Sequence, residues 1–362
     1  MKQLSVIVEQ CLAPVPGGTG RYAAQIAQAL AERPRPGWSV RTVTAWHRNV
    51  RAAAIAGTNG PVRLPAGHRV LGELWLRGLP PTVGGQAVHA TTPLAPPRLD
   101  GLVVTVHDAV PWTHPETLTA RGVHWHQVMV GRAMERARSV VVPSAAVASD
   151  LHGIFPRAAD RIVVVGHGVT ALPVPADAKH RRRDLGLTER YVLAIGTLEP
   201  RKGIDTLIAA MGQPALHQAH LAIVGPGGWG EVDVPTLAAR AEVAPERLHK
   251  LGRLSDADLA AVLDGAAAFA APSRSEGFGL PVLEAMAAAV PVVCSDAPAL
   301  VELVAGAAIV VPRQDPVALA DALAQVLQDR ALATDLALRG QQRSSAFSWP
   351  EAANRLWDLH AG

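Results

Sequence analysis

Strand-like and helix-like segments alternate along the whole of this chain of 362 residues. Short runs rich in Val, Ile, Leu and Ala, such as Tyr191–Ile195, have the length of buried strands, and longer amphipathic stretches separate them. Parallel strands require helical crossovers of this kind, because a tight hairpin joins only antiparallel strands. The alternation therefore predicts α/β architecture with doubly wound parallel sheets that carry helices on both faces.

The expected elements fall in two similar series. The first series has strands near Leu4–Val8, Ser39–Ala45, Ala87–Ala90, Leu102–Val106, Ser139–Val142 and Arg161–Val165, and helices near Thr19–Glu32, Gly67–Arg77, Leu118–Arg138 and Ala145–His152. The second has strands near Tyr191–Ile195, His220–Val224, Leu248–Leu251, Ala267–Ala270, Val292–Cys294 and Ala308–Val311, and closing helices near Pro316–Gln328, Ala331–Ser345 and Pro350–Leu359. The Pro- and Gly-rich stretch Gly57–Pro65 is expected to be irregular.

Two domains fit this length, and a hydrophobic content of 49% supplies two cores. The proline-rich, basic segment Leu172–Arg183 indicates a linker between them, followed by the start of a solvated helix. We therefore predict an N-terminal domain at residues 1–172 and a C-terminal domain at residues 173–345, followed by a last helix within residues 346–362.

Two carboxylates, Glu276 and Glu284, flank a Gly-rich turn and the start of an Ala-rich helix, Pro281–Ala289. Pro suits the first turn of a helix, where its missing N–H has no partner anyway. Three N–H groups then point out of the helix N-terminus, those of Phe278, Gly279 and Leu280. Such a terminus is a natural seat for a phosphate, and carboxylates on two sides can grip hydroxyls, which suits a sugar nucleotide. The alternative is two solvated carboxylates, one of them favoured by the helix dipole.

Two adjacent cations, Arg201 and Lys202, follow the strand Tyr191–Ile195 and precede a helix that starts at about Ile204. Open α/β sheets bind ligands at the carboxyl ends of their strands. Because Arg offers a planar fork and Lys a point charge, the pair suits a diphosphate.

With these motifs the sequence resembles the retaining glycosyltransferases of family 4, which have the two-domain GT-B fold. The resemblance spans nearly the whole chain, and its main motifs are Glu199–Gly203, the pair Glu276 and Glu284, and Gly17–Arg21. Supporting runs fall in the expected order at Val106–Asp108, Val142–Ser144 and Gly166–Val169. The resemblance implies two Rossmann-like parallel-sheet domains that face a central cleft. It also implies that the last helix crosses back to the N-terminal domain, anchored by Trp349 and Trp357.

The function that the resemblance implies is retaining transfer of a hexose, of the mannose or glucose type, from a nucleoside diphosphate sugar to a hydroxyl. The donor would be a co-substrate such as GDP-mannose or UDP-glucose, with no metal and no cofactor. The acceptor would be a glycan or a lipid-linked precursor in cell-surface glycan, glycolipid or secondary-metabolite synthesis. Front-face attack, in which the leaving phosphate takes the acceptor's proton, is also carried over from the family.

The same resemblance gives roles to individual residues. Arg201 and Lys202 would stabilise the leaving diphosphate, and Glu276 would hold the donor sugar. Glu284 would grip the ribose, Gly252 would lie near the base, and His107 would contact the transferred sugar. His107 ends a strand, Gly101–Val106, at the ligand-facing edge of the first domain, although a lone His at a strand end is more often structural.

The glycine loop around Gly18 and Gly20 also matches a dinucleotide-binding fingerprint. That fingerprint requires a tight turn directly after the first strand and an acidic residue after the second. Here several residues separate Val8 from the glycines, and the second strand leads to His47 without an acid. We therefore expect backbone N–H groups of the loop to approach the donor's diphosphate or the acceptor, with Arg21 adding a positive charge.

Three other functions are less well supported. A non-catalytic nucleotide-sugar-binding protein would have a degraded site, whereas here the candidate residues are present together. An NAD-dependent oxidoreductase would use the Gly18 loop and would bind NAD. A pyridoxal-dependent phosphorylase would need a cofactor lysine, and none is recognisable.

A net charge of +3 hides an asymmetry, because residues 1–172 carry 17 Lys and Arg against 9 Asp and Glu, and residues 173–362 carry 17 against 22. Nucleic acid is a poor candidate partner, because the basic residues are scattered and no binding motif accompanies them. An anionic membrane surface or a phosphorylated acceptor is one reading, and a solvated surface is the other. The basic and apolar segment Leu118–Arg138 either lies on a lipid interface or packs with snorkelling arginines.

The N-terminus, Met1–Glu9, enters a strand directly and has no apolar core of a signal peptide. No apolar run approaches the roughly 20 residues of a membrane span. The two cysteines, Cys11 and Cys294, lie in separate halves and suggest neither a disulfide framework nor a metal site. We therefore expect a cytoplasmic protein, at the inner face of the membrane if it contacts lipid, and the abundance of Ala, Arg, Gly and Pro suggests a bacterial source.

Overall fold

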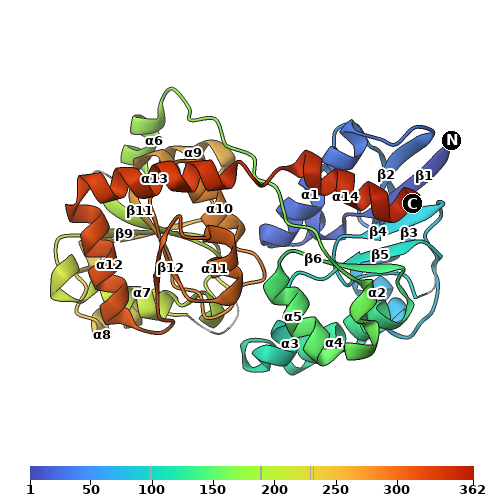
Figure 1. Ribbon diagram of the computed structural model, residues 1–362, viewed down its shortest axis with the longest axis horizontal. Helices are drawn as coiled ribbons and strands as arrows, with labels where there is room; N and C mark the ends of the chain where they lie inside the picture. The colour runs from blue at the N-terminus through green and yellow to red at the C-terminus, as the bar shows by residue number, and fades with distance from the viewer. Residues whose placement is uncertain (98–99, 188–189, 229, 231) are drawn as a thin grey trace. The chain divides into compact units, whose positions relative to one another are not determined.

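The computed structural model describes residues 1–97, 100–187, 190–228, 230 and 232–362. The chain divides into two compact units. Unit 1 comprises Met1–Gly168 with Ser348–Gly362, and unit 2 comprises Val169–Phe347. Each unit is a parallel sheet with helices on both faces, so the predicted doubly wound α/β class is confirmed (Figure 1).

Within the described residues, the sheet of unit 1 has seven parallel strands in the order β3-β2-β1-β4-β5-β6-β7. Successive side chains of a strand point to opposite faces, so that Val6 and Ile7 of β1 enter different cores. The strands are β1 Lys2–Ile7, β2 Trp38–Trp46, β3 Asn59–Gly67, β4 Ala87–Ala90, β5 Leu102–Thr105, β6 Ser139–Val142 and β7 Ile162–Val164. Both sides of the sheet are therefore covered, as parallel sheets require.

One face of this sheet packs against α2, α4 and α5, through side chains such as Leu71, Met129 and Leu151. The other face packs against α1 and the last helix, α14, which lie side by side (Figure 1). The helices of unit 1 are α1 Gly17–Glu32, α2 His68–Leu76, α3 Val110–Thr113, α4 Ala120–Arg136, α5 Ala145–Ile154 and α14 Trp349–Ala361.

The prediction that Gly57–Pro65 is irregular is wrong. This stretch forms most of strand β3, which pairs in parallel with β2. β3 is the edge of its sheet, where a proline is tolerated because one side of the strand needs no backbone donor. Pro61 and Pro65 therefore lower the strand propensity of this stretch, but they do not prevent it from forming an edge strand.

Helix α14 belongs to unit 1 although it ends the chain. Ser348 caps its N-terminus by accepting a hydrogen bond from the N–H of Glu351 at 3.2 Å. The indole of Trp357 is fully buried and donates to the carbonyl of Leu30, on α1, at 3.3 Å. Burial of a side chain of this size contributes on the order of 3 kcal/mol, so the helix is firmly held.

The segment predicted as Leu118–Arg138 forms α4, and its apolar residues face the core. Met129, Val130 and Met134 are buried, and Arg132 donates to the carbonyl of Trp75. These contacts favour a packed domain helix over a helix on a lipid interface. No helix among the described residues is both long and apolar enough to cross a membrane.

In the described part of unit 2, the sheet has six parallel strands in the order β10-β9-β8-β11-β12-β13. The order runs outward in both directions from β8 and β11, so the topological switch point lies between these two strands. The strands are β8 Tyr191–Ile195, β9 His220–Val224, β10 Leu248–Gly252, β11 Ala266–Ala271, β12 Val292–Ser295 and β13 Ile309–Val311.

The helices of unit 2 also divide between the faces of the sheet. Helices α7, α8, α12 and α13 cover one core, and α9, α10 and α11 cover the other. The helices are α6 Ala178–Asp184, α7 Ile204–Met211, α8 Val234–Arg240, α9 Asp256–Gly265, α10 Leu280–Ala287, α11 Pro298–Val304, α12 Pro316–Gln328 and α13 Arg330–Ser344.

Candidate active site

The switch point of unit 2 brings two sequence motifs together. The loop after β8 carries Arg201 and Lys202, and the loop after β11 carries Glu276. Strands β8 and β11 are parallel neighbours, so both loops leave the same edge of the sheet. This edge is where ligands bind in open α/β sheets.

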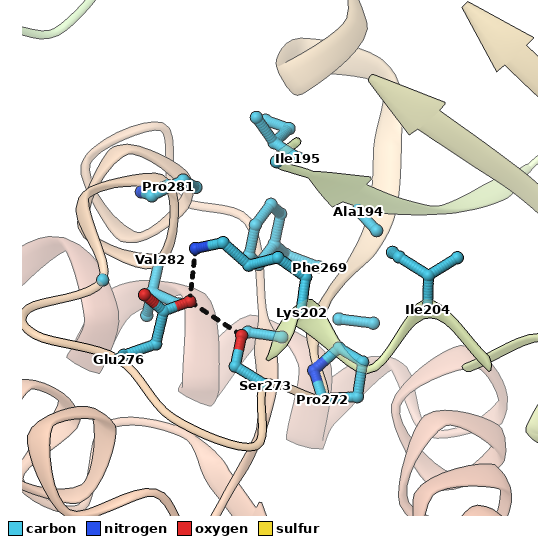
Figure 2. A pocket seen from close by; sticks show the side chains of 14 residues that line it. Ala194, Ile195, Lys202, Ile204, Phe269, Pro272, Ser273, Glu276, Pro281 and Val282 are labelled. Carbon is cyan, nitrogen blue, oxygen red and sulfur yellow. Dashed lines mark hydrogen bonds and ion pairs between the residues drawn. The ribbon is translucent and has the colours of Figure 1, made fainter. Parts of the chain in front are cut away.

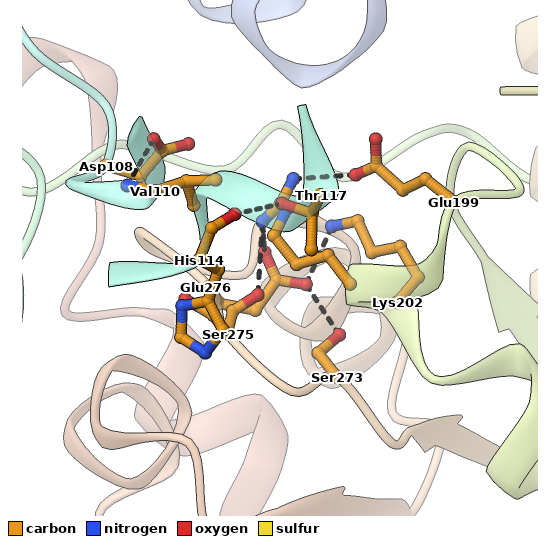
Figure 3. A network of polar contacts seen from close by, with 10 residues as sticks. Asp108, Val110, His114, Thr117, Glu199, Lys202, Ser273, Ser275 and Glu276 are labelled. Atoms are coloured by element: carbon orange, nitrogen blue, oxygen red, sulfur yellow. Dashed lines mark hydrogen bonds and ion pairs between the residues drawn. The ribbon is translucent and has the colours of Figure 1, made fainter. Parts of the chain in front are cut away.

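Glu276 is the centre of a polar network (Figures 2 and 3). Its Oε1 atom accepts hydrogen bonds from Lys202 Nζ and from Ser273 Oγ, both at 2.7 Å. Its Oε2 atom lies 3.4 Å from the guanidinium of Arg201. The Glu276 side chain is only 11% exposed, so these partners replace most of its contact with water.

Arg201 is itself held on several sides. It donates to Glu199 Oε1 at 2.8 Å and to the carbonyl of Ser275 at 3.1 Å, and its own carbonyl accepts from the N–H of Arg274 at 2.8 Å. The two cations therefore face two carboxylates, Glu199 and Glu276, and their formal charges cancel. An anionic ligand that binds here must take over the cations from the carboxylates.

The cations also control the charge of Glu276. Burial alone would raise the pKa of this carboxyl group, but the charges of Lys202 and Arg201, with hydrogen bonds from Lys202 and Ser273, lower the pKa below its ordinary value. Glu276 is thus an anion at neutral pH and can accept hydrogen bonds from hydroxyl groups.

The backbone explains why a glycine follows the cations. Gly203 has the left-handed conformation, with φ of 65°, and joins the short turn Pro200–Lys202 to α7. A Cβ atom at this position would lie 2.1 Å from the carbonyl oxygen of Pro272, in the loop after β11. Only glycine lets the two loops approach this closely.

Helix α10 starts where the Glu276 loop ends. Gly279 is its N-cap residue, with φ of 97°, and Glu284 lies one turn into the helix. The side chains of Phe278 and Leu280 are buried in the core of unit 2, so only their backbone could face a ligand. The sequence predicted that these residues lie around the start of one helix, and in the structure they lie around the start of α10.

A small pocket lies between Lys202, Glu276 and the start of α10 (Figure 2). Its volume of about 20 Å³ admits a water molecule or a hydroxyl group, not a whole sugar ring. Gly252 is farther away in the sheet, because it ends the edge strand β10 and β9 separates that strand from β8.

In unit 1, His107 follows strand β5 at the carboxyl edge of the sheet. Its Nε2 atom lies 2.8 Å from the carbonyl oxygen of Thr91. A carbonyl only accepts, so Nε2 carries the proton and Nδ1 keeps its lone pair in the neutral ring. Burial lowers the pKa of His107, which favours this neutral form.

Gly18 and Gly20 do not form a loop ahead of the helix, because α1 already begins at Gly17. Gly20 is buried, and a Cβ atom there would lie 2.4 Å from Cβ of Pro16. The packing of the preceding turn therefore accounts for this glycine. Gly18 is exposed in the first turn of α1.

The sequence did not predict that Tyr22 and His167 lie beside His107, although His167 belongs to the run Gly166–Val169. The ring of Tyr22 stands edge-on to that of His107 with centroids 4.9 Å apart, and His167 lies 5.5 Å away. The Tyr22 hydroxyl is hydrogen-bonded to Thr105 Oγ1 at 3.0 Å. Tyr22 directly follows the Gly17–Arg21 motif, which could have drawn attention to it. A local sequence motif does not show, however, that Tyr22 contacts a residue as distant in sequence as His107.

A second buried pair of histidines continues this cluster. His89 bonds to Thr105 Oγ1 at 3.2 Å, and its other nitrogen lies 3.3 Å from His360, on α14. Burial lowers the pKa of His89 to about 3, and it lowers the pKa values of His167 and His360 well below the ordinary value of 6.5. These rings therefore stay neutral in the folded protein.

We expect the stability of unit 1 to fall as the pH drops from about 7 towards 4. Below the ordinary pKa of histidine, the unfolded chain takes up protons on these side chains, whereas the folded chain does not. Each such histidine therefore lowers the free energy of unfolding by about 1.4 kcal/mol per pH unit. His360→Gln should flatten the dependence of the unfolding free energy on pH, measured by denaturant titration. His124→Gln, which changes an exposed histidine of the same unit, is the control. Equal slopes in His360→Gln and the unchanged protein would contradict the assignment.

The candidate residues thus fall into two groups. Arg201 and Lys202 both contact Glu276 in unit 2, where Gly279 caps the adjoining helix that carries Glu284. His107, Gly18 and Gly20 belong to unit 1. Among the described residues, no group of three or more His, Cys, Asp or Glu side chains is placed to hold a metal ion.

Comparison with known families gives one clear match. Residues 176–343 match the model of the family described as "Glycosyl transferases group 1". The chain is 31% identical, over 271 residues, to O-antigen chain mannosyltransferase B of Escherichia coli, and the match covers 72% of this chain and 70% of that protein. It is 36% identical over 194 residues to D-inositol 3-phosphate glycosyltransferase of Salinispora arenicola, a match that covers 49% of this chain and only 43% of that protein.

Among solved structures, the chain resembles Anabaena HepE in complex with UDP and glucose. The TM-score is 0.77 at 19% sequence identity, and the superposition covers 100% of both chains. At this identity the likeness establishes the shared fold.

Proposed function

Because this chain belongs to the group 1 glycosyl transferases, we propose that it moves a hexose from a nucleoside diphosphate sugar to a hydroxyl group with retention of anomeric configuration. The hexose is of the mannose or glucose type, and the acceptor is a glycan or a lipid-linked precursor. The transfer needs no metal ion and no further cofactor. One observation carries the proposal, namely the contact of Lys202 and Arg201 with Glu276 at the switch point of unit 2.

The hard step in this reaction is departure of the nucleoside diphosphate, because negative charge grows on the leaving phosphate. Lys202 and Arg201 stabilise that charge, and they are held in place before the donor arrives. Fixed cations of this kind supply the electrostatic help that a bound metal ion gives in other enzymes. Backbone N–H groups of Phe278, Gly279 and Leu280 at the start of α10 add to it.

Glu276 holds the hydroxyl groups of the donor sugar. When the diphosphate takes over Lys202 and Arg201, the carboxylate loses part of its present hydrogen bonding and accepts from the sugar instead. Its position beside the cations suits this role, because the sugar of the donor is joined directly to the second phosphate. Glu284, one turn into α10, grips the ribose, and Gly252 lies near the base.

His107 contacts the transferred sugar from unit 1. With its Nε2 proton directed to Thr91, its Nδ1 atom can accept a hydrogen bond from a sugar hydroxyl. Tyr22 and His167 fix the ring from the sides. The described residues offer no obvious enzyme nucleophile, so we propose that the acceptor attacks on the same face of the sugar from which the diphosphate leaves. The leaving phosphate takes the acceptor's proton.

The identities of sugar and acceptor rest on relatives. A mannosyltransferase among them supports mannose, and HepE in complex with UDP and glucose supports a nucleotide donor. A glycosyltransferase named for D-inositol 3-phosphate supports an acceptor that carries a phosphate. Both cysteines are buried and form no disulfide, which agrees with a reducing, cytoplasmic location.

The proposal is tested by a calorimetric titration of the protein with UDP-glucose, GDP-mannose, UDP, GDP and NAD. One of the nucleoside diphosphate sugars should bind in the micromolar to millimolar range that is usual for enzyme substrates, and NAD should not bind. Lys179→Ala, which removes an exposed lysine of unit 2, should bind the same donor unchanged. Failure of every sugar nucleotide, or binding of NAD alone, would overturn the proposal.

A further inference from the structure

A buried carboxylate in unit 1, outside the residues considered so far, holds two histidines at the edge of the sheet. Glu9 Oε1 accepts from His47 Nε2 at 2.7 Å and from His68 Nδ1 at 2.8 Å, and Oε2 accepts from the N–H of Ala45 at 2.7 Å. Glu9 follows β1, His47 follows β2 and His68 follows β3. The carboxyl ends of three neighbouring strands thus converge on one small cluster, at the edge where such sheets bind ligands.

The side chains of the cluster become more exposed to solvent from Glu9 to His47 to His68. The side chain of Glu9 is 4% exposed, that of His47 is 25% exposed and that of His68 is 58% exposed. Glu9 fixes which nitrogen of each ring carries the proton that faces inward. Among the described residues, the second nitrogen of each ring has no hydrogen-bond partner. The arrangement therefore presents two oriented imidazoles to an external ligand.

The electrostatics of the cluster favour an anion. Burial alone would raise the pKa of Glu9, but hydrogen bonds from His68 and His47 lower it, so the carboxylate is charged. The bond to Glu9 raises the pKa of His68, against the opposing charge of Arg69. The buried negative charge of Glu9 thus supports a positive charge on the His68 ring.

The surroundings are basic and include an exposed aromatic ring. The segments after β2 and β3 carry Arg48, Arg51 and Arg69, and no acidic residue occurs in 46–53 or 67–72. Trp46 is 56% exposed, and in the parallel ladder it pairs with Gly67, which precedes His68. An indole left open to solvent beside polar groups is typical of a binding surface, and its flat face suits a sugar ring.

We propose that the cluster of Glu9, His47 and His68 is the acceptor subsite, and that it binds a saccharide that carries a phosphate group. His47, His68 and Arg69 hold the phosphate by charge-assisted hydrogen bonds, and Trp46 packs against the attached sugar. This assignment rests on the proposed transferase function. It names the acceptor by its chemistry, a polyhydroxylated ring that carries a phosphate group, which is either free or presented by a lipid.

The test uses α-D-mannose 1-phosphate and inorganic phosphate as probes, in calorimetric titrations of the full chain. The nucleoside diphosphate that binds in the donor panel is present at saturation, so that Arg201 and Lys202 are already occupied. Both probes should bind, and the uncharged methyl α-D-mannopyranoside should bind more weakly than mannose 1-phosphate. His68→Gln should weaken both probes on the order of tenfold or more, the loss of one charge-assisted hydrogen bond.

Two further variants separate recognition from folding. Trp46→Ala should weaken mannose 1-phosphate roughly fivefold and leave inorganic phosphate unchanged, because the ring contacts only the sugar. His124→Gln is the matched control for an exposed histidine of unit 1 and should bind both probes as the unchanged protein does. Thermal unfolding of each variant verifies that the fold is retained.

A vesicle-binding assay shows whether the phosphate group belongs to a lipid or to a free sugar phosphate. Binding to phosphatidylcholine vesicles that contain phosphatidylinositol, abolished by His68→Gln, identifies a lipid-presented acceptor, whereas binding to mannose 1-phosphate alone identifies a free one. If neither probe binds, or if both bind His68→Gln and His47→Gln undiminished, the subsite is refuted. A protein that binds no nucleoside diphosphate refutes the proposed function, whereas one that binds it but neither probe refutes only the subsite.

Discussion

Replacing Lys202 by alanine is expected to lower the turnover of the nucleoside diphosphate sugar on the order of a hundredfold or more, the usual loss when a group that stabilises developing charge is removed. The ammonium lies 2.7 Å from Glu276 at the carboxyl edge of β8 and is only 16% exposed. Water cannot readily replace it there as a partner for the leaving phosphate. Arg201→Ala should cause a loss of similar size, and both variants should bind the donor more weakly.

The same substitution changes the charge balance around Glu276. Without Lys202, Glu276 keeps Ser273 and the longer contact with Arg201, so the pKa of its carboxyl group should rise towards the ordinary value. The kinetic measurement is the dependence of initial rate on donor concentration for Lys202→Ala, Arg201→Ala and Lys179→Ala. Normal kinetics in the first two variants would show that the diphosphate binds elsewhere, whereas Lys179→Ala should behave as the unchanged protein.

Substitutions of Glu276 and Glu284 are expected to change the kinetics in different ways. Glu276→Ala should chiefly lower kcat, again on the order of a hundredfold, because its contacts with the sugar gain strength as positive charge develops at the anomeric carbon. Glu284→Ala should chiefly raise the KM for the donor, because contacts with a ribose are similar in the ground and transition states. Steady-state kinetics of both variants separates the two effects.

The Glu276 variants need a check on folding. Removing this carboxylate leaves two cations, Lys202 and Arg201, partly buried without their shared partner, which destabilises a protein. Glu276→Gln keeps the shape of the side chain and its capacity to accept from Ser273, and should show the same fall in kcat with a smaller change in thermal unfolding. If Glu276→Ala raises KM and Glu284→Ala lowers kcat instead, the two ends of the donor have been assigned in reverse.

Much of the fold could be predicted because periodicity is a local property. The strand Tyr191–Ile195 is found at the predicted residues, and the alternation of elements fixed the class. Strand β3 was missed because its prolines argue against a strand unless its place at the sheet edge is known. That place depends on which strands pair, and a local pattern does not contain it.

In the candidate site too, local sequence motifs predict some contacts, whereas others depend on residues that are distant in sequence. The sequence predicts that Arg201, Lys202 and Glu276 share a sheet edge, because motifs that follow parallel strands gather there. It does not predict that Glu199 and Ser273 complete the network, because the contacts of single polar residues in loops leave no periodic signal in the sequence. The cluster of Glu9, His47 and His68 was likewise invisible, since its members are joined only through the pairing of β1, β2 and β3.

We propose retaining transfer in which Arg201 and Lys202 take the place of a metal ion. Its most direct test is proton NMR of the anomeric signals while the protein slowly hydrolyses the donor that it binds, with water as the acceptor and a chelator of divalent ions present. We predict that the first sugar released has the same anomeric configuration as the donor, and that chelation does not change the rate. Release of the inverted sugar, or a reaction that stops when divalent ions are removed, would contradict this mechanism.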